Sequence, residues 1–101
     1  MLIWIPVDGS DEKASKVVPQ FEVLKWALID FDVGEVKSVK FYETREELGG
    51  EWVDFVILAN KFENYMDFMN EGMMCLCVRE EETIEDIMTA FKFKELDEVG
   101  L

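Results

Sequence analysis

The middle of the chain shows the clearest pattern of apolar and polar positions. Residues 53–58 and 73–78 are short apolar runs, typical of strands buried on both faces of a parallel sheet. Asn60 and Glu63 form a capping-box pattern for a helix between the two runs, and Gly72 suits the end of that helix. One face of the helix carries apolar residues at positions i, i+3, i+4 and i+7: Phe62, Tyr65, Met66 and Met69. The pattern therefore predicts a β-α-β unit.

The same criteria predict three further strands: Leu2–Val7, 21–32 and 35–43, the last two paired as a hairpin. Residues 9–20 are polar and rich in turn formers, and a connection this long is often a binding loop. Thr44 and Glu47 form a capping box for a short helix that Gly49-Gly50 ends. Thr83 opens a last helix, whose inner face carries Ile84, Ile87, Met88 and Phe91.

The order of these elements predicts one α/β domain over residues 1–101, since a chain of this length supports a single core. We expect three layers, with helices on both faces of a five-stranded mixed sheet. Strand order 3-2-1-4-5 satisfies the preference for short connections and right-handed crossovers, and only strand two runs antiparallel in it. Leu96 is expected to anchor the C-terminal tail, with the last few residues loose.

Charge restricts the classes of function. The formal net charge is −13 and the chain has no histidine. Such a surface repels nucleic-acid phosphates and anionic membranes, so we expect neither as a partner. Without histidine, hydrolases of the Ser-His-Asp and Cys-His types and His-based metal sites are excluded. No apolar run approaches the roughly 18 residues of a membrane span, and no signal-peptide pattern opens the chain, so we expect a cytoplasmic protein.

Cys75 and Cys77 lie two positions apart in a predicted strand, so their side chains share one face of the sheet. A disulfide between them would distort the strand. Two interpretations remain open. Either both cysteines are buried core thiols, or, together with nearby methionines, they are ligands of a soft metal ion.

Four segments share order and spacing with a known protein family: residues 3–9, residues 18–21 with 27–30, residues 53–57, and residues 82–87. On these segments the chain, from Met1 to about Leu96, resembles the dinitrogenase iron–molybdenum cofactor biosynthesis family. These are nitrogenase accessory proteins with a ribonuclease H-like fold. The resemblance implies a non-enzymatic protein that binds or carries an iron–molybdenum or other metal–sulfur cofactor, or another small ligand.

This chain departs from the family pattern in two places. It has Gln20-Phe21-Glu22 where the family commonly has His-Phe-Gly, and residues 58–62 replace a glycine-rich turn. The missing histidine is a potential ligand, and the missing glycines would let backbone N–H groups approach an anionic cluster. Two functions therefore remain open: a carrier of a cofactor, and an interaction domain that kept the fold without the cofactor site and binds a partner protein.

The predicted topology places a candidate site at the carboxyl ends of strands one and four, where ligands bind in open α/β sheets. The residues expected there are Asp8, Gly9, Phe21, Asn60 and Lys61. The alternative is that Asp8 closes a turn and Asn60 only caps its helix. A nuclease site is disfavoured, because two-metal hydrolysis needs several converging carboxylates and only Asp8 ends a central strand.

Overall fold

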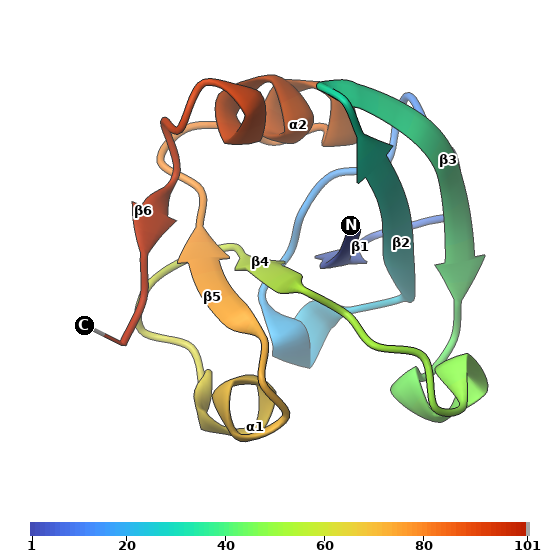
Figure 1. The fold of residues 1–101 in the computed structure, drawn as a ribbon, viewed down its shortest axis with the longest axis vertical. Coiled ribbons are helices and arrows are strands. Elements are labelled where there is room, and N and C mark those ends of the chain that lie inside the picture. The colour runs from blue at the N-terminus through green and yellow to red at the C-terminus, as the bar shows by residue number, and fades with distance from the viewer. Residues whose placement is uncertain (101) are drawn as a thin grey trace.

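The computed structural model describes residues 1–100, which form a single six-stranded sheet in the order β3-β2-β1-β4-β5-β6 (Figure 1). The strands are β1 (Leu2–Val7), β2 (Lys25–Asp32), β3 (Glu35–Tyr42), β4 (Phe55–Leu58), β5 (Met74–Cys77) and β6 (Asp97–Glu98). The α-helices are α1 (Met66–Asn70) and α2 (Ile84–Lys92), and the 3-10 turns are η1 (Gln20–Glu22) and η2 (Arg45–Leu48). None of the described helices is long and apolar enough to cross a membrane.

The predicted order of the first five strands is confirmed, with β1 central and parallel to β4. The prediction of five strands is wrong, because β6 pairs with β5 at the sheet edge. The prediction that only strand two runs antiparallel is wrong for the same reason, since β6 is antiparallel to β5. The tail folds back because Leu96 and Val99 are both buried, so residues 97–99 are held on the sheet.

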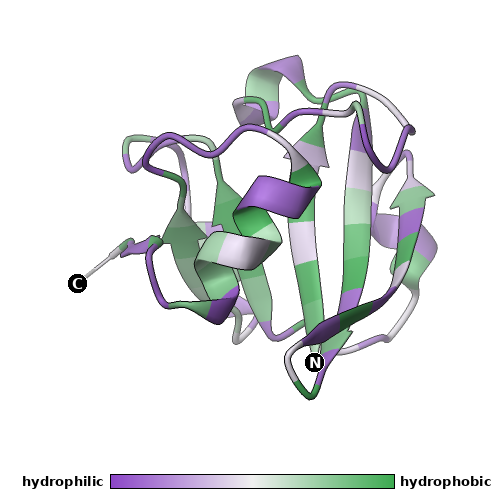
Figure 2. Ribbon diagram, turned by 90° about the horizontal axis from the view of Figure 1, so that it is seen from above, coloured by the Kyte–Doolittle hydropathy of each residue, from purple (hydrophilic) through white to green (hydrophobic). Residues whose placement is uncertain are grey.

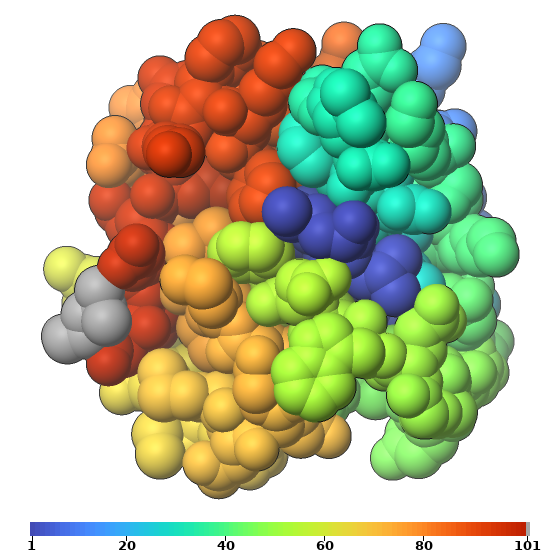
Figure 3. Space-filling view, viewed as in Figure 1, coloured from blue at the N-terminus to red at the C-terminus, as the bar shows by residue number. Residues whose placement is uncertain are grey.

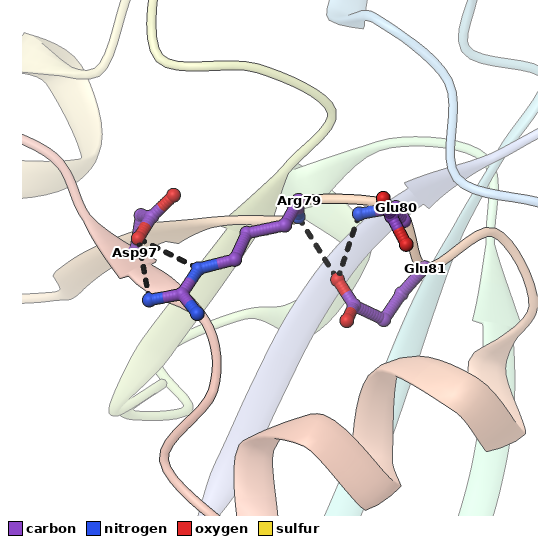
Figure 4. A network of polar contacts seen from close by, with 4 residues as sticks. All are labelled: Arg79, Glu80, Glu81 and Asp97. Atoms are coloured by element: carbon purple, nitrogen blue, oxygen red, sulfur yellow. Dashed lines mark hydrogen bonds and ion pairs between the residues drawn. The ribbon is translucent and has the colours of Figure 1, made fainter.

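A polar network holds β6 in place (Figure 4). Arg79 lies on the loop after β5. Its guanidinium atoms Nε and Nη2 are each 2.9 Å from Oδ1 of Asp97. The Glu81 carboxylate accepts hydrogen bonds from the backbone N–H groups of Arg79 and Glu80 at 2.9 and 3.3 Å. The charged loop between β5 and α2 therefore has an ordered conformation that is tied to the C-terminal strand.

Alternating side chains along the strands build one core on each face of the sheet. Ile3, Ile5 and Ile29 pack with α2 on one face, and Figure 2 shows α2 lying across apolar strands. Trp4 and Trp26 lie on the other face, where their rings stack at 5.2 Å, and Phe68 of α1 packs against them. Helices therefore cover both faces, as the three-layer prediction required.

Two predicted elements are shorter in the structure. The second strand begins at Lys25 rather than at Phe21, because residues 20–22 form the turn η1. The helix predicted from Asn60 covers only Met66–Asn70, and its one buried residue is Phe68. The predicted helix face is therefore wrong: Phe62 is 86% exposed, Met66 and Met69 are exposed, and Tyr65 is half-buried.

Other local predictions are confirmed. The first strand covers Leu2–Val7, as expected. The Thr83 hydroxyl accepts a hydrogen bond from the Asp86 N–H at the start of α2, whose buried face includes Ile84, Ile87 and Met88. Gly72 follows α1 with φ +88°, the left-handed conformation that favours glycine after a helix.

Candidate functional site

The candidate site lies beyond the carboxyl ends of β1 and β4, which are parallel neighbours in the sheet. After β4 the chain turns through residues 59–65, and η1 from the β1–β2 connection packs beside it. These two segments border a cavity of about 510 Å³ that is open to solvent. It is lined by Gln20, Phe21, Asn60, Phe62, Glu63 and Asn64. The structure therefore brings Phe21 and Asn60 together, although they are distant in the sequence.

Glu63 occupies the centre of this arrangement. One carboxylate oxygen accepts a hydrogen bond from the Gln20 N–H at 2.7 Å. The other accepts from the Ala59 and Asn60 N–H groups at 2.9 and 3.1 Å. These backbone donors form the cradle in which an anionic ligand would be held. The cradle is therefore filled by a carboxylate of the chain itself.

The two segments are joined at a second point, where the Gln20 side-chain amide donates to the Asn64 carbonyl at 2.9 Å. On this braced support, Phe21 is 87% and Phe62 86% exposed. Fixed backbone segments thus present both aromatic rings to solvent. We call Phe21, Phe62 and the cavity between them the aromatic surface.

Asp8, Gly9 and Lys61 do not line the cavity. The Asp8 carboxylate accepts a hydrogen bond from the Lys16 N–H at 2.8 Å, which closes the loop between these two residues. Gly9 lies against Ser15, since a Cβ at Gly9 would be 3.3 Å from the Ser15 hydroxyl. The Lys61 ammonium lies 5.5 Å from the centre of the Phe62 ring.

The side chain of Asn60 also has a local bonding partner. Its Oδ1 accepts from the Phe62 N–H at 2.9 Å, which makes a turn rather than the start of a helix. The Glu63 carboxylate accepts a hydrogen bond from the Asn60 N–H, so half of the expected capping box is present. The Asp8 carboxylate and the Asn60 side-chain oxygen, both predicted as site groups, thus already accept hydrogen bonds within the chain.

The loop of residues 9–20 is held by hydrogen bonds within itself and to its neighbours. Ser15 is buried, and its hydroxyl accepts from the Asp11 N–H at 2.9 Å. Hydrogen bonds from the Lys13 and Ala14 N–H groups hold the pKa of Asp11 below its ordinary value. Val17 forms a bridge to Val7 of β1. This loop is therefore held by hydrogen bonds within itself and by backbone bonds to Pro6 and Glu82.

Cys75 and Cys77 are buried in β5, and both are free thiols, as the core interpretation predicted. Burial raises the pKa of both, and Asp97 and Glu63 raise that of Cys77 further, so the protonated thiols are favoured. The Cys75 thiol lies 3.7 Å from the Tyr65 carbonyl. Within residues 1–100, no three His, Cys, Asp or Glu side chains are grouped closely enough to hold a metal ion.

These donor groups do not fit a metal–sulfur cofactor. Such a cluster needs accessible thiolates or free backbone N–H donors, and here the thiols are buried and protonated. The N–H groups of Gln20, Ala59 and Asn60, beyond the carboxyl ends of β1 and β4, already donate to the Glu63 carboxylate. Sequence reasoning identified Glu63 as a capping residue but missed its contact with Gln20, which depends on the tertiary fold.

The fold of this chain is similar to that of solved protein structures. No known family model matches the sequence, and no curated protein matches it. The crystal structure of a putative dinitrogenase from Methanocaldococcus jannaschii is similar with a TM-score of 0.75 at 19% identity, covering 99% of this chain and 95% of that one. An NMR structure of a putative NifB protein from Thermotoga has a TM-score of 0.74 at 21% identity, covering 96% and 91%. At these identities, the likeness establishes the shared fold.

Proposed function

We propose that this protein is a cytoplasmic, non-enzymatic accessory protein of the nitrogenase-related type, and that it binds a partner protein through its aromatic surface. The observation that carries the proposal is the Glu63 carboxylate. It takes up the N–H groups of Gln20, Ala59 and Asn60, which a small anionic cofactor would need. The remaining recognition feature at this edge of the sheet is apolar, and it suits a protein surface.

The aromatic surface has the character of an interaction site. Phe21 and Phe62 each leave most of the side chain in water, and they flank one cavity. Exposed aromatic residues on a rigid support lose little conformational entropy on binding, and such residues often supply most of the binding energy. Hydrogen bonds through Glu63 and Gln20 provide that support.

Charge indicates the chemistry of the partner. Glu22 is exposed next to Phe21, and the chain as a whole carries −13. A partner that presents an apolar side chain ringed by lysine or arginine complements this surface and is steered towards it.

The second candidate is a carrier of a metal–sulfur cofactor. It is supported by the fold, which is shared with proteins named putative dinitrogenase and putative NifB. Purification without oxygen, from cells supplied with iron and molybdenum, separates the two candidates. A carrier contains stoichiometric metal and absorbs visible light, whereas the interaction protein proposed here is colourless and metal-free.

The partner is identified by photo-crosslinking. A photoreactive phenylalanine analogue replaces Phe62 in one variant and Val33 in another, because both positions are 86% exposed and Val33 lies on the β2–β3 turn. We expect a specific crosslinked protein from position 62 only. Binding of that protein, once purified, should weaken about 30-fold or more in Phe62→Ser, the loss typical of an interface hot spot. Val33→Ser should leave it unchanged.

Equal crosslinking from both positions, or equal affinity for Phe62→Ser and the unchanged protein, would contradict the proposal. Bound metal after anaerobic purification would favour the carrier instead.

A further inference from the structure

A second cavity, of about 460 Å³, opens at the opposite end of the parallel strands, beside the C-terminal end of α2. Figure 3 shows the segments that form it meeting on one face: the N-terminus in blue, the β2–β3 turn in teal, the segment that leads into β4 in yellow-green and the end of α2 in red. We call this cavity the α2 groove. Its volume lies within the range of roughly 300–1,000 Å³ typical of small-molecule sites.

The floor of the α2 groove is aromatic. The Phe91 ring of α2 packs edge-on against Phe31 of β2 at 5.4 Å and against Phe55 of β4 at 4.9 Å between ring centres. Met74 adds an apolar side chain that is 54% exposed. A preformed apolar surface of this kind suits a ligand with a hydrocarbon body, because binding removes apolar area from water without rearranging the wall.

Lysines outnumber acidic side chains in the lining of the groove, in contrast to the molecule as a whole. Lys92 and Lys94 line it, in a chain with ten basic residues and a net charge of −13. Within residues 1–100 neither ammonium group lies within 4.0 Å of a carboxylate. The Lys92 Cε lies 3.5 Å from where a Cβ would stand at Gly34, so this side chain extends across the β2–β3 turn. Glu98 is the acidic residue of the lining.

The backbone is strained at two positions beside the groove. Val33 and Lys94 have φ values of 51° and 58°, and they are the non-glycine residues with positive φ in the described chain. Val33 precedes Gly34, which lines the groove, and Lys94 lines it directly. Glycine would be favoured at position 94, after the end of α2, so a lysine there points to a use for its charge.

We propose that the α2 groove binds a small amphipathic carboxylate, with the hydrocarbon body on the aromatic floor and the carboxylate between Lys92 and Lys94. The apolar floor selects against small hydrophilic anions. The two ammonium groups select the carboxylate over an alcohol or an amine with the same hydrocarbon body. This site is separate from the aromatic surface, and it does not depend on the function proposed for that surface.

The test uses decanoate as the probe, below its micelle concentration, with decanol and decylamine as controls. In a ¹H–¹⁵N NMR titration, decanoate should shift the signals of residues around Phe31, Phe55 and Phe91. We expect decanol and decylamine to bind about tenfold or more weakly, the loss typical of a charge-assisted hydrogen bond. Equal binding of the three probes would overturn the proposal, as would shifts that centre on the aromatic surface.

Two variants separate binding from folding. Lys92→Glu with Lys94→Glu should weaken decanoate binding about tenfold or more. Lys13→Glu with Lys40→Glu, an equal charge change outside the groove lining, should leave it unchanged. Lys94→Gly should raise the melting temperature, by relieving the positive φ, and still weaken binding.

Unchanged decanoate affinity in Lys94→Gly and in the double glutamate variant would overturn the assignment of these lysines. Two other occupants are tested alongside. Groove signals that move with protein concentration alone would show a second copy of the chain there. Binding to anionic phospholipid vesicles but not to free decanoate would show a membrane surface. Either result would also overturn the proposal.

Discussion

Val33 and Gly34 join β2 to β3, with φ values of 51° and 75°. Positive φ at both central residues is the signature of a type I′ turn, whose twist matches that of the paired strands. Glycine accepts this conformation freely, whereas a β-branched residue does so at a cost. The hairpin was predictable from the sequence, but the strain at Val33 was not, because valine signals a strand and not a turn.

Val33→Asn should stabilise the fold by about 1 kcal/mol, because asparagine tolerates the left-handed conformation that valine resists. Urea unfolding measures the change. Val33→Thr is the matched control, since threonine is also polar but keeps the branched Cβ, and we expect no gain from it. An equal gain in both variants would attribute the effect to lost surface hydrophobicity.

Glu63 shows how far local rules reach at single residues. Its hydrogen bond to the Asn60 N–H spans three positions, and the capping-box pattern predicted it. Its hydrogen bond to the Gln20 N–H spans 43 positions, and no local pattern encodes it. Topology predicted that Phe21 and Asn60 would lie close together, and both line the cavity, but the contact between Glu63 and Gln20 was not predictable from local patterns.

Among the elements, α1 is the one that sequence periodicity described least well. The spacing of Phe62 and Met66 favours a helix face, but the hydrogen bonds of Asn60 and Glu63 close a turn that ends before Tyr65. Side chains that compete for backbone groups in this way shorten helices. The end of the helix was predicted correctly, because Gly72 has a conformation that few other residues adopt.

Gly72→Ala should destabilise the protein by about 1–3 kcal/mol, for two reasons. Its φ is +88°, and an added Cβ would lie 2.8 Å from the Trp52 ring. Gly50→Ala is the control, because no atom lies within 4 Å of a Cβ there and its φ is not positive. Thermal unfolding of both variants tests this. A similar loss at both positions would show that the Trp52 contact and the backbone conformation of Gly72 are unimportant.

The strand β6 was missed because its residues, Asp97 and Glu98, are both acidic and exposed. Neither has the β-branched or aromatic character by which strands are recognised. The signal lay in the flanking residues Leu96 and Val99, whose burial holds the segment on the sheet edge. The Arg79–Asp97 ion pair then links β6 to the loop that carries Glu81.

Glu81, on the loop between β5 and α2, makes the free energy of unfolding depend on pH. Partial burial raises the pKa of Glu81, but hydrogen bonds from the Arg79 and Glu80 N–H groups outweigh it and lower the pKa overall. A lowered pKa in the folded state stabilises the fold above the unfolded value of about 4.3, and this contribution is lost as the pH falls through the folded value.

Glu81→Gln should therefore lower the free energy of unfolding at pH 7 by less than about 1 kcal/mol, since water screens this half-exposed group. The difference from the unchanged protein should shrink as the pH falls below the unfolded value of about 4.3 and should vanish once Glu81 is protonated in the folded state. Urea unfolding across this pH range provides the measurement. A difference that stays constant with pH would assign the effect to packing instead.

For the molecule as a whole, the order of five strands followed from rules on connection length and handedness. The α2 groove did not, because its lining comes from the N-terminus, the β2–β3 turn, β4, β5 and the end of α2. Each segment had already been assigned to the core or to a turn for local reasons. Only the folded arrangement brings Phe31, Phe55 and Phe91 together with two lysines.

A net charge of −13 on 101 residues also predicts repulsion within the folded molecule. Raising the ionic strength from about 0.01 M to 0.15 M shortens the screening length from about 30 to 8 Å. The melting temperature should therefore rise by several degrees. Replacing the exposed Glu12, Glu46 and Glu95 with glutamine should raise the low-salt value and reduce the salt dependence. A melting temperature independent of salt in both proteins would show that the repulsion is negligible.

The Glu63 carboxylate occupies the N–H cradle in the way that a bound anion would. A tethered carboxylate competes at an effective concentration of the millimolar order or higher, so a free anion of similar affinity must reach a comparable concentration to displace it. Glu63→Ala should lose about 1–3 kcal/mol of stability, because three backbone donors lose their acceptor. Added formate should restore part of the melting temperature in this variant, but not in Glu46→Ala. The absence of rescue would show that the cradle collapses when Glu63 is removed. Rescue would show that the cradle is a preformed anion receptor, which Glu63 occupies in the unchanged protein.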